Sequence, residues 1–164
     1  MGTVQAAASD PADRDNGSRL GAVHVVCPHC HTTNRVPRER LGGDARCGKC
    51  KQTLLAGCPF DLGRADFERH VAVSELPLVV DFWAPWCAPC RAMAPAYEQA
   101  AARLAPGVRL AKLNTEAEPE LASRFGIRAI PTLIAFKNGR EIARRSGASD
   151  LPGLVQWISS HVSA

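Results

Sequence analysis

The sequence predicts an α/β fold with a mixed central sheet flanked by helices, preceded by a small cysteine-rich domain. After residue 58, segments with strand and helix patterns alternate, and an antiparallel hairpin and a last helix follow. Before residue 58, the chain has few large apolar residues and is interrupted by Cys, Gly and Pro. A segment of about 34 residues of this kind cannot close a hydrophobic core unaided, so we expect its cysteines to hold it together.

The domain boundaries follow from changes in composition along the chain. Residues 1–23 are rich in Ala, Asp, Gly and Ser and have no periodicity, which is typical of a disordered tail. Residues 24–57 form the expected metal-binding domain, and short strands are predicted at 22–26 and 53–55. Residues 58–164 form the expected α/β domain.

Each element of the larger domain has its own pattern. Residues 77–84, PLVVDFWA, are a continuous apolar run, as expected for a strand that is buried on both faces. Residues 87–105 are rich in Ala and predict a helix, with a kink at Pro95. The pair Asn138 and Gly139 predicts a hairpin turn. The remaining strands are expected at 59–62, 108–114, 132–139 and 140–147, and the remaining helices at 64–74, 119–126 and 150–162.

Composition and charge restrict the function classes. Hydrophobic residues make up 46% of the chain, and no apolar run approaches the roughly 20 residues of a membrane span. The net charge of +4 lies in residues 24–57, because residues 58–164 carry 12 lysines and arginines against 11 acidic residues. We therefore expect neither nucleic-acid binding nor membrane insertion. The first 20 residues contain no apolar block of a secretion signal, so we expect a cytoplasmic protein.

Two cysteine pairs in the small domain have the spacing of a metal site. Cys27 and Cys30 enclose two residues, as do Cys47 and Cys50, and 16 residues separate the pairs. Each short spacing lets a tight turn aim both sulfurs at one ion. We expect one structural Zn²⁺ per chain, because a closed shell of four thiolates leaves no position for a substrate.

Other interpretations of these cysteines remain open. The four thiols are also compatible with two disulfides, with an iron–sulfur cluster, or with a zinc ion that senses redox state. His29 lies within the first pair and His31 directly follows it, and both are alternative ligands; otherwise both are expected in a solvent-exposed loop. Gly48 suits the second turn, where backbone N–H groups can point at sulfur.

A third pair, Cys87 and Cys90, has a different context. It follows a predicted buried strand and opens a predicted helix, whose first N–H groups are unpaired and carry partial positive charge. This position favours the thiolate form of Cys87. We expect Cys87 to be the attacking thiol of a disulfide exchange and the less exposed Cys90 to be the resolving thiol. Trp83 is expected beneath this site, and Trp86 at its edge.

Asp81 interrupts the apolar run before the third pair, where the burial of a charge is costly. Desolvation should raise its pKa, and a buried carboxylate behind Cys90 can act as general base toward that thiol. Lys112, on the next predicted strand, is expected to modulate Asp81. The alternatives are a hydrogen-bonded structural acid at Asp81 and an exposed strand lysine at Lys112.

The motifs FWAPWCAPCRAMAP, AKLN, FGIRAIPTLIAFKNG and SGA occur in this order, and residues 58–164 resemble a thioredoxin. With the two cysteine pairs in front, residues 24–164 resemble the zinc-containing second thioredoxins of bacteria. The resemblance implies a thioredoxin fold behind a zinc-ribbon-like domain, and a cis-proline at Pro131 that faces the dithiol. It also implies an apolar substrate rim made of Trp86, Ala88, Pro89, Ile130, Gly147 and Ala148. Ala88 stands where the family usually has glycine, so a modest change in redox potential is expected.

The resemblance implies the activity of a protein-disulfide reductase. Its substrates would be disulfide-containing proteins, and a thioredoxin reductase would recharge it with electrons from NADPH. The chain itself would bind no organic cofactor, and we expect a monomer. The alternatives are a disulfide oxidase or isomerase, and a redox-switched binding protein or holdase whose sensor is the zinc domain.

Cys58 is the cysteine that belongs to none of the three pairs. It lies at the start of the first predicted strand of the larger domain. We expect a buried, inert thiol there, with a regulatory thiol as the alternative.

Overall fold

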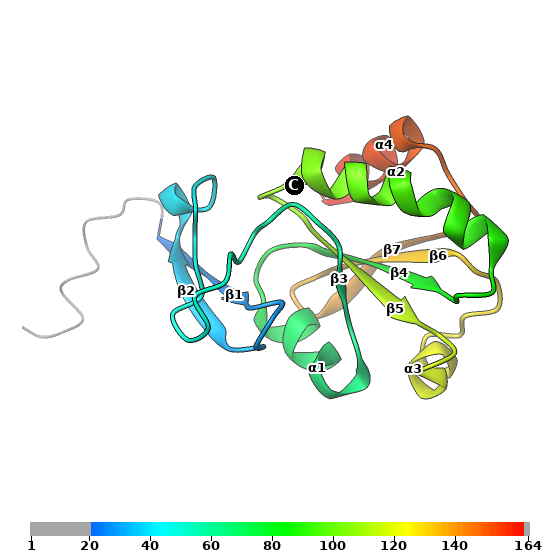
Figure 1. The fold of residues 1–164 in the computed structure, drawn as a ribbon, viewed down its shortest axis with the longest axis horizontal. Coiled ribbons are helices and arrows are strands. Elements are labelled where there is room, and N and C mark those ends of the chain that lie inside the picture. The colour runs from blue at the N-terminus through cyan, green and yellow to red at the C-terminus, as the bar shows by residue number, and fades with distance from the viewer. Residues whose placement is uncertain (1–20, 163–164) are drawn as a thin grey trace, which may run out of the picture.

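The computed structural model describes residues 21–162, and its main feature is a five-stranded sheet in the order β3-β5-β4-β6-β7 (Figure 1). The strands are β3 (Phe60–Asp61), β4 (Leu78–Trp83), β5 (Arg109–Asn114), β6 (Thr132–Lys137) and β7 (Arg140–Ser146). β5 runs parallel to both β3 and β4, whereas β6 is antiparallel to both β4 and β7. The predicted mixed sheet is therefore confirmed. Residues 1–20 of the expected tail lie outside the described part.

Helices cover both faces of the sheet. They are α1 (Arg64–Glu68), α2 (Ala88–Leu104), α3 (Pro119–Arg124) and α4 (Leu151–Val162). α2 and α4 lie on one face, and α1 and α3 lie on the other (Figure 1). The helix predicted at 64–74 is α-helical only to Glu68, and Arg69–Val73 forms a π-helical turn that buries both His70 and Val71. Within residues 21–162, no helix is both long and apolar enough to cross a membrane.

Strand β4 separates the two halves of the core. Val79 packs into the cluster formed with α2 and α4, while Val80 and Phe82 pack into the cluster on the opposite face. Successive side chains of a strand point to opposite faces, so Asp81 shares the face of Val79. The apolar run was predicted to be buried on both faces, and every residue from Leu78 to Phe82 is indeed buried. Its single acid is thereby directed toward the side of the sheet that α2 covers.

The N-terminal domain is built on a two-stranded antiparallel sheet of β1 (Ala22–Val26) and β2 (Thr33–Pro37), followed by a 3-10 turn, Arg38–Arg40. Ala22 and Val23 belong to β1, although their composition had placed them in the expected tail of residues 1–23. The strand predicted at 53–55 is wrong, because Thr53 forms only an isolated bridge with Arg46. The second strand, TNRVP, was not predicted because it has one large apolar side chain, Val36, in an otherwise polar segment.

Candidate active site and metal centre

The dithiol lies where β4 ends and α2 begins. Cys87 is the N-cap of α2, and its Sγ accepts a hydrogen bond of 3.2 Å from the backbone N–H of Cys90. A helix N-terminus directed at sulfur favours negative charge on that sulfur. The two cysteines form a disulfide with Cα atoms 5.3 Å apart, which is the oxidised form of the site. Both residues are buried in this form, so their exposure does not distinguish them.

A cis-peptide bond faces the dithiol. The bond between Ile130 and Pro131 is cis, and the carbonyl oxygen of Ile130 lies 3.8 Å from Cys87 Sγ. Gly147 donates its backbone N–H to the carbonyl of Pro131 at 2.9 Å, which ties the end of β7 to the same loop. Trp86, which directly precedes Cys87 in the sequence, is 67% exposed. The remaining members of the expected rim, which are all exposed, are Ala88, Pro89, Gly147 and Ala148.

Asp81 is a buried carboxyl group, only 1% exposed. Its Oδ1 has no hydrogen-bond partner among the described residues, which speaks against a hydrogen-bonded structural acid. Burial raises the pKa of Asp81 from 3.8 to about 7, and the positive charge of Lys112 opposes part of this increase. A carboxyl group with a pKa near neutrality can both take and return a proton under physiological conditions.

Lys112 is paired with Asp81 across the parallel strands β4 and β5. It is half-buried, and its ammonium nitrogen lies 4.2 Å from the centre of the Trp83 ring, in a cation–π contact. The alternative of an exposed strand lysine is therefore wrong. Trp83 packs against the cluster of Ala84, Cys87 and Cys90, beneath the dithiol as expected.

The four cysteines of the N-terminal domain come together in one group. Their Sγ atoms all lie within 4.8 Å of one another, and the pairs Cys27–Cys50 and Cys30–Cys47 are 3.6 Å apart. A tetrahedral zinc ion with Zn–S bonds of about 2.3 Å requires sulfur–sulfur separations of roughly 3.8 Å. All four thiols are free rather than paired in disulfides. The donor set therefore fits zinc, and neither His29 nor His31 belongs to it.

The two cysteine turns have the same backbone design. The N–H of His31 donates to the carbonyl of Cys27, and the N–H of Lys51 donates to that of Cys47, both at 3.0 Å. His31 and Lys51 both adopt left-handed backbone conformations, with φ of 62° and 65°. Each turn thus reverses the chain immediately after its second cysteine, which directs both sulfurs inward.

A side chain and a backbone N–H donate to Cys47. Asn34 Nδ2 lies 3.5 Å from Cys47 Sγ, and the N–H of Lys49 donates to the same sulfur at 3.4 Å. Burial raises the pKa of Cys47, but these donors and the backbone of Cys50 outweigh burial and bring the value to about 6. The N–H of Gly48 donates to Asn34 Oδ1 rather than to sulfur. Asn34 could not be predicted, because a polar residue in a short strand has no distinctive spacing.

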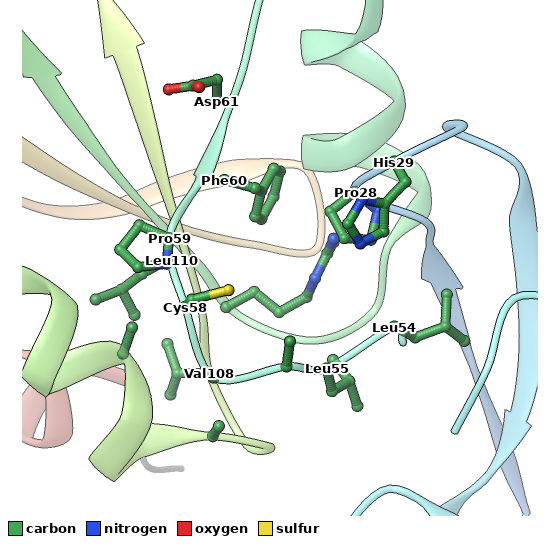
Figure 2. Close-up of a pocket in the computed structure, with 15 residues that line it drawn as sticks. Pro28, His29, Leu54, Leu55, Cys58, Pro59, Phe60, Asp61, Val108 and Leu110 are labelled. Atoms are coloured by element: carbon green, nitrogen blue, oxygen red, sulfur yellow. The ribbon is translucent and has the colours of Figure 1, made fainter. Parts of the chain in front are cut away.

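Cys58 departs from the sequence-based prediction. Its side chain is exposed, so the expectation of a buried thiol is wrong. The strand begins only at Phe60, and Gly57, with a φ of 70°, turns the preceding linker along the surface. Figure 2 shows Cys58 on this linker, at a cavity of about 460 Å³ that Leu54, Val108 and other side chains line.

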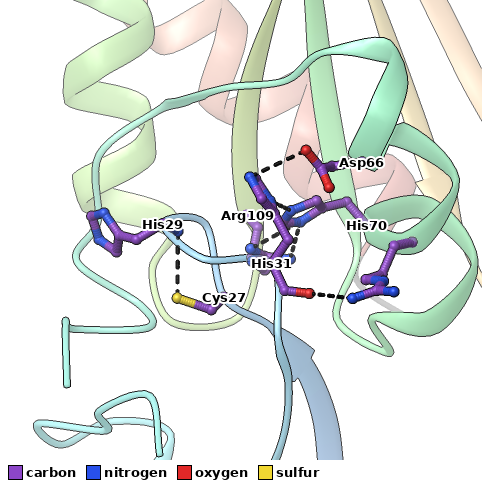
Figure 3. A network of polar contacts seen from close by, with 7 residues as sticks. Cys27, His29, His31, Asp66, His70 and Arg109 are labelled. Carbon is purple, nitrogen blue, oxygen red and sulfur yellow. Dashed lines mark hydrogen bonds and ion pairs between the residues drawn. The ribbon is translucent and has the colours of Figure 1, made fainter. Parts of the chain in front are cut away.

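A buried polar network joins the N-terminal domain to the sheet. Arg109, the first residue of β5, donates to the carbonyl of Val26 at 2.8 Å and to Ser74 Oγ at 3.0 Å. Its guanidinium also lies 3.4 Å from His70 (Figure 3). His31 is half-buried and not in a solvent-exposed loop, because its Nδ1 lies 3.0 Å from His70 Nε2. Burial and the charge of Arg109 lower the pKa of His70 to about 3, so His70 is neutral. The contacts of Arg109 were not predicted from the sequence. A charged residue inside the predicted strand 108–114 could have indicated that Arg109 has buried polar partners.

A mixed sheet with a dithiol at a helix N-terminus, faced by a cis-proline, defines a thiol–disulfide oxidoreductase. The comparisons with known proteins agree with this class. The family model described as Thioredoxin matches residues 59–160, and the one described as Thioredoxin 2, N-terminal, a zinc ribbon, matches residues 26–52.

Individual relatives extend the match over most of the chain. Thioredoxin C-3 of Corynebacterium nephridii is 41% identical over 138 residues, which are 84% of this chain and 94% of that protein. The thioredoxin of Synechocystis is 48% identical over 98 residues, 60% of this chain and 92% of that protein. The crystal structure of Malassezia sympodialis thioredoxin is similar with a TM-score of 0.57 and 31% identity, covering 62% of this chain and 89% of that one.

The chain belongs to the thioredoxin family and carries an N-terminal zinc ribbon. Its activity is accordingly that of a protein-disulfide reductase, with disulfide-containing proteins as substrates and a thioredoxin reductase as the kind of enzyme that recharges it.

Proposed function

We propose that Cys87 attacks the disulfide of a protein substrate and that Cys90 resolves the resulting mixed disulfide. The observation that carries this assignment is the position of Cys87 as N-cap of α2, with the N–H of Cys90 directed at its sulfur. A thiolate at Cys87 is stabilised there by the helix N-terminus. Cys90 lies inside the first turn and has no comparable donor among the described contacts.

The exchange proceeds in two balanced steps. The Cys87 thiolate attacks one sulfur of the substrate disulfide, forms a mixed disulfide and releases the other substrate sulfur as a thiolate. The Cys90 thiolate then attacks Cys87 Sγ, which forms the Cys87–Cys90 disulfide and releases the second substrate thiolate. Two electrons pass from the dithiol to the substrate.

Asp81 is the proposed general base of the second step. Its carboxylate takes the proton of the Cys90 thiol, and the carboxylic acid then returns a proton to the departing substrate thiolate. A pKa raised to about 7 by burial suits both transfers near neutral pH. Lys112, whose charge lowers this pKa, would limit how far burial raises it.

The substrate would bind as an extended segment beside the dithiol. Pro131 has no N–H, and the cis bond turns the backbone of Ile130 toward Cys87. We propose that Ile130 pairs with the substrate backbone and that exposed apolar residues contact its side chains. These residues are Trp86, Ala88, Pro89, Gly147 and Ala148.

We also propose that residues 24–57 form a unit whose zinc ion is structural, one per chain, and that residues 58–164 carry the chemistry. Cys27, Cys30, Cys47 and Cys50 would hold the ion. Four thiolates complete a tetrahedral shell, so the ion would supply folding energy rather than a reactive position.

The remaining proposals concern the cellular setting. NADPH would reach the dithiol only through the reductase, and the chain would act as a monomer without an organic cofactor of its own. The cytoplasm is the proposed compartment, because its reducing conditions keep metal-binding thiols reduced.

The experiment that tests the order of attack is covalent trapping with a disulfide-containing protein substrate. Cys90→Ser should accumulate a mixed disulfide on Cys87, because no second thiol releases the substrate. Cys87→Ser should accumulate none, and Cys58→Ser is the matched control that should behave as the parent. Intact-mass spectrometry reads all three variants. An adduct on Cys90 of the Cys87→Ser variant, or none on the Cys90→Ser variant, would overturn the assignment.

A further inference from the structure

Tyr97 is a fully buried residue of α2 whose hydroxyl group contacts the backbones of two strands. Its Oη lies 2.8 Å from the carbonyl oxygen of Ala111 on β5 and 3.1 Å from that of Val79 on β4. The phenol thus spans the two central parallel strands from the side of α2. No other side chain of α2 makes a described hydrogen bond to the sheet.

The two carbonyl groups that Tyr97 contacts adjoin the pair Asp81 and Lys112. Val79 lies two residues before Asp81, and Ala111 directly precedes Lys112, the register partner of Asp81. The side chains of Asp81 and Tyr97 lie on the same side of the sheet. Burial and the charge of Asp81 raise the pKa of the phenol well above 10, so Tyr97 stays protonated and remains a donor.

The helix positions of Tyr97 and the dithiol are also related. Tyr97 follows Cys90 by seven residues, which places both on one face of α2 two turns apart, with the buried Met93 between them. Pro95 lies between Cys90 and Tyr97 and removes one N–H from the helical hydrogen-bond ladder. The first half of α2 therefore depends on contacts to the sheet for its place relative to β4.

We propose that Tyr97 is a positioning residue of the disulfide exchange, which fastens α2 to β4 and β5 and thereby sets Cys90 against Asp81. The inference rests on the proposed role of Asp81 as the general base. Proton transfer between Cys90 and Asp81 needs hydrogen-bonding reach, and a shift of α2 by a fraction of an ångström is sufficient to slow it.

The charges around Asp81 come from two elements. β5 contributes Lys112, and α2 contributes Tyr97, whereas β6 places the apolar Leu133 opposite Asp81. Since Lys112 is unchanged in a Tyr97→Phe variant, the charge balance at Asp81 stays the same. A slower resolution of the mixed disulfide in this variant would then reflect a change in the position of Cys90 relative to Asp81.

The test is the rate at which the mixed disulfide on Cys87 is resolved, followed by rapid acid quench and mass spectrometry. Tyr97→Phe should slow this step about 3- to 10-fold at pH 7. The defect should vanish as the pH rises, because Cys90 then loses its proton unaided. In an Asp81→Asn background, Tyr97→Phe should cause no further slowing, because the two changes affect one step.

Gln99→Gly is the matched control, because it weakens the exposed side of the same helix without touching the sheet. Both variants should lose about 2–4 °C in melting temperature, but the control should resolve the mixed disulfide at the parental rate. A parental rate for Tyr97→Phe, or a slowing that is additive with Asp81→Asn or independent of pH, overturns the inference alone. A parental rate for Asp81→Asn at every pH overturns the general base, and the positioning role with it.

Discussion

At the scale of single residues, the surroundings of each thiol decide its chemistry. Cys87 receives an N–H at a helix start and faces the carbonyl of Ile130, which suits attack on a substrate disulfide. Cys47 receives the side chain of Asn34 and a backbone N–H inside a cluster of four sulfurs, so it suits a metal. Cys58 is exposed and belongs to neither group. The cysteines of this chain therefore suit separate roles, because their hydrogen-bond donors, their burial and their neighbouring thiols differ.

The burial of Asp81 predicts a pH-dependent cost in stability. Its pKa in the folded protein, about 7, is above its ordinary value of 3.8, so the folded state keeps a proton that the unfolded state loses between these values. The free energy of unfolding should therefore fall by up to about 4 kcal/mol as pH rises from about 4 to 7, and stay level above 7. Asp81→Asn does not titrate and should lack this decline.

Urea unfolding of the oxidised parent and of Asp81→Asn between pH 4 and 8 measures the effect. The two proteins should be about equally stable near pH 4, and the variant should be the more stable one at pH 7 and above. A variant that is less stable than the parent at pH 7 would identify Asp81 as a structural acid.

At the scale of secondary-structure elements, the start of β5 connects the two parts of the molecule. Arg109 is 5% exposed, and its guanidinium reaches Val26, directly before the first zinc-site cysteine. The same group contacts Ser74 and His70 after α1 and stacks 4.8 Å from the centre of the Phe60 ring. Three segments that are distant in sequence therefore meet at one side chain.

Arg109→Met tests this connection. The change leaves the carbonyl of Val26 and the hydroxyl of Ser74 without their described donor, which should lower the free energy of unfolding by about 1–3 kcal/mol. Amide hydrogen exchange around Val26 should become faster, while zinc content stays the same because no ligand is changed. The control Arg103→Met, on the exposed side of α2, should change stability by less than about 0.5 kcal/mol. Equal stability of the two variants would show that Arg109 does not join the domains.

At the scale of the whole molecule, two ways of holding a fold are combined in one chain. The larger domain buries apolar clusters on both faces of its sheet. The small domain buries Val23, Val25, Val36, Ala45 and Leu54 among its cysteines. We propose that this small core depends on a bound metal, because a core of this size does not offset the entropy of ordering the segment.

The sequence predicted much of this arrangement, and its errors have physical causes. The strand predicted at 77–84 and the helix predicted at 87–105 were confirmed, because burial and secondary-structure propensity favour the same conformation there. The strand at 33–37 was missed because its pairing with β1 depends on backbone hydrogen bonds rather than on apolar side chains. The contacts of Tyr97 and Arg109 were missed because their partners are distant in sequence. An arginine inside a predicted strand is unusual, but neither residue lies in a motif whose spacing identifies its partners.

For the candidate sites, too, the features that depend on local sequence were predicted, and those that depend on distant contacts were not. Short spacings identified the dithiol and the metal-binding cysteines, since both depend on local turns. The expected burial of Cys58 and the expected exposure of His31 were wrong, because the course of a linker and the docking of a domain are set by distant contacts.

The most direct test of the account is a paired measurement of zinc content and disulfide reduction in two cysteine variants. Cys87→Ser should lose disulfide reduction completely while keeping about one zinc per chain, because the metal group contains only the four N-terminal cysteines. Cys27→Ser should lose zinc while keeping measurable disulfide reduction, because Cys87 and Cys90 remain intact. Loss of the metal in Cys87→Ser, or a loss of reduction in Cys27→Ser as complete as in Cys87→Ser, would contradict the separation of the two sites.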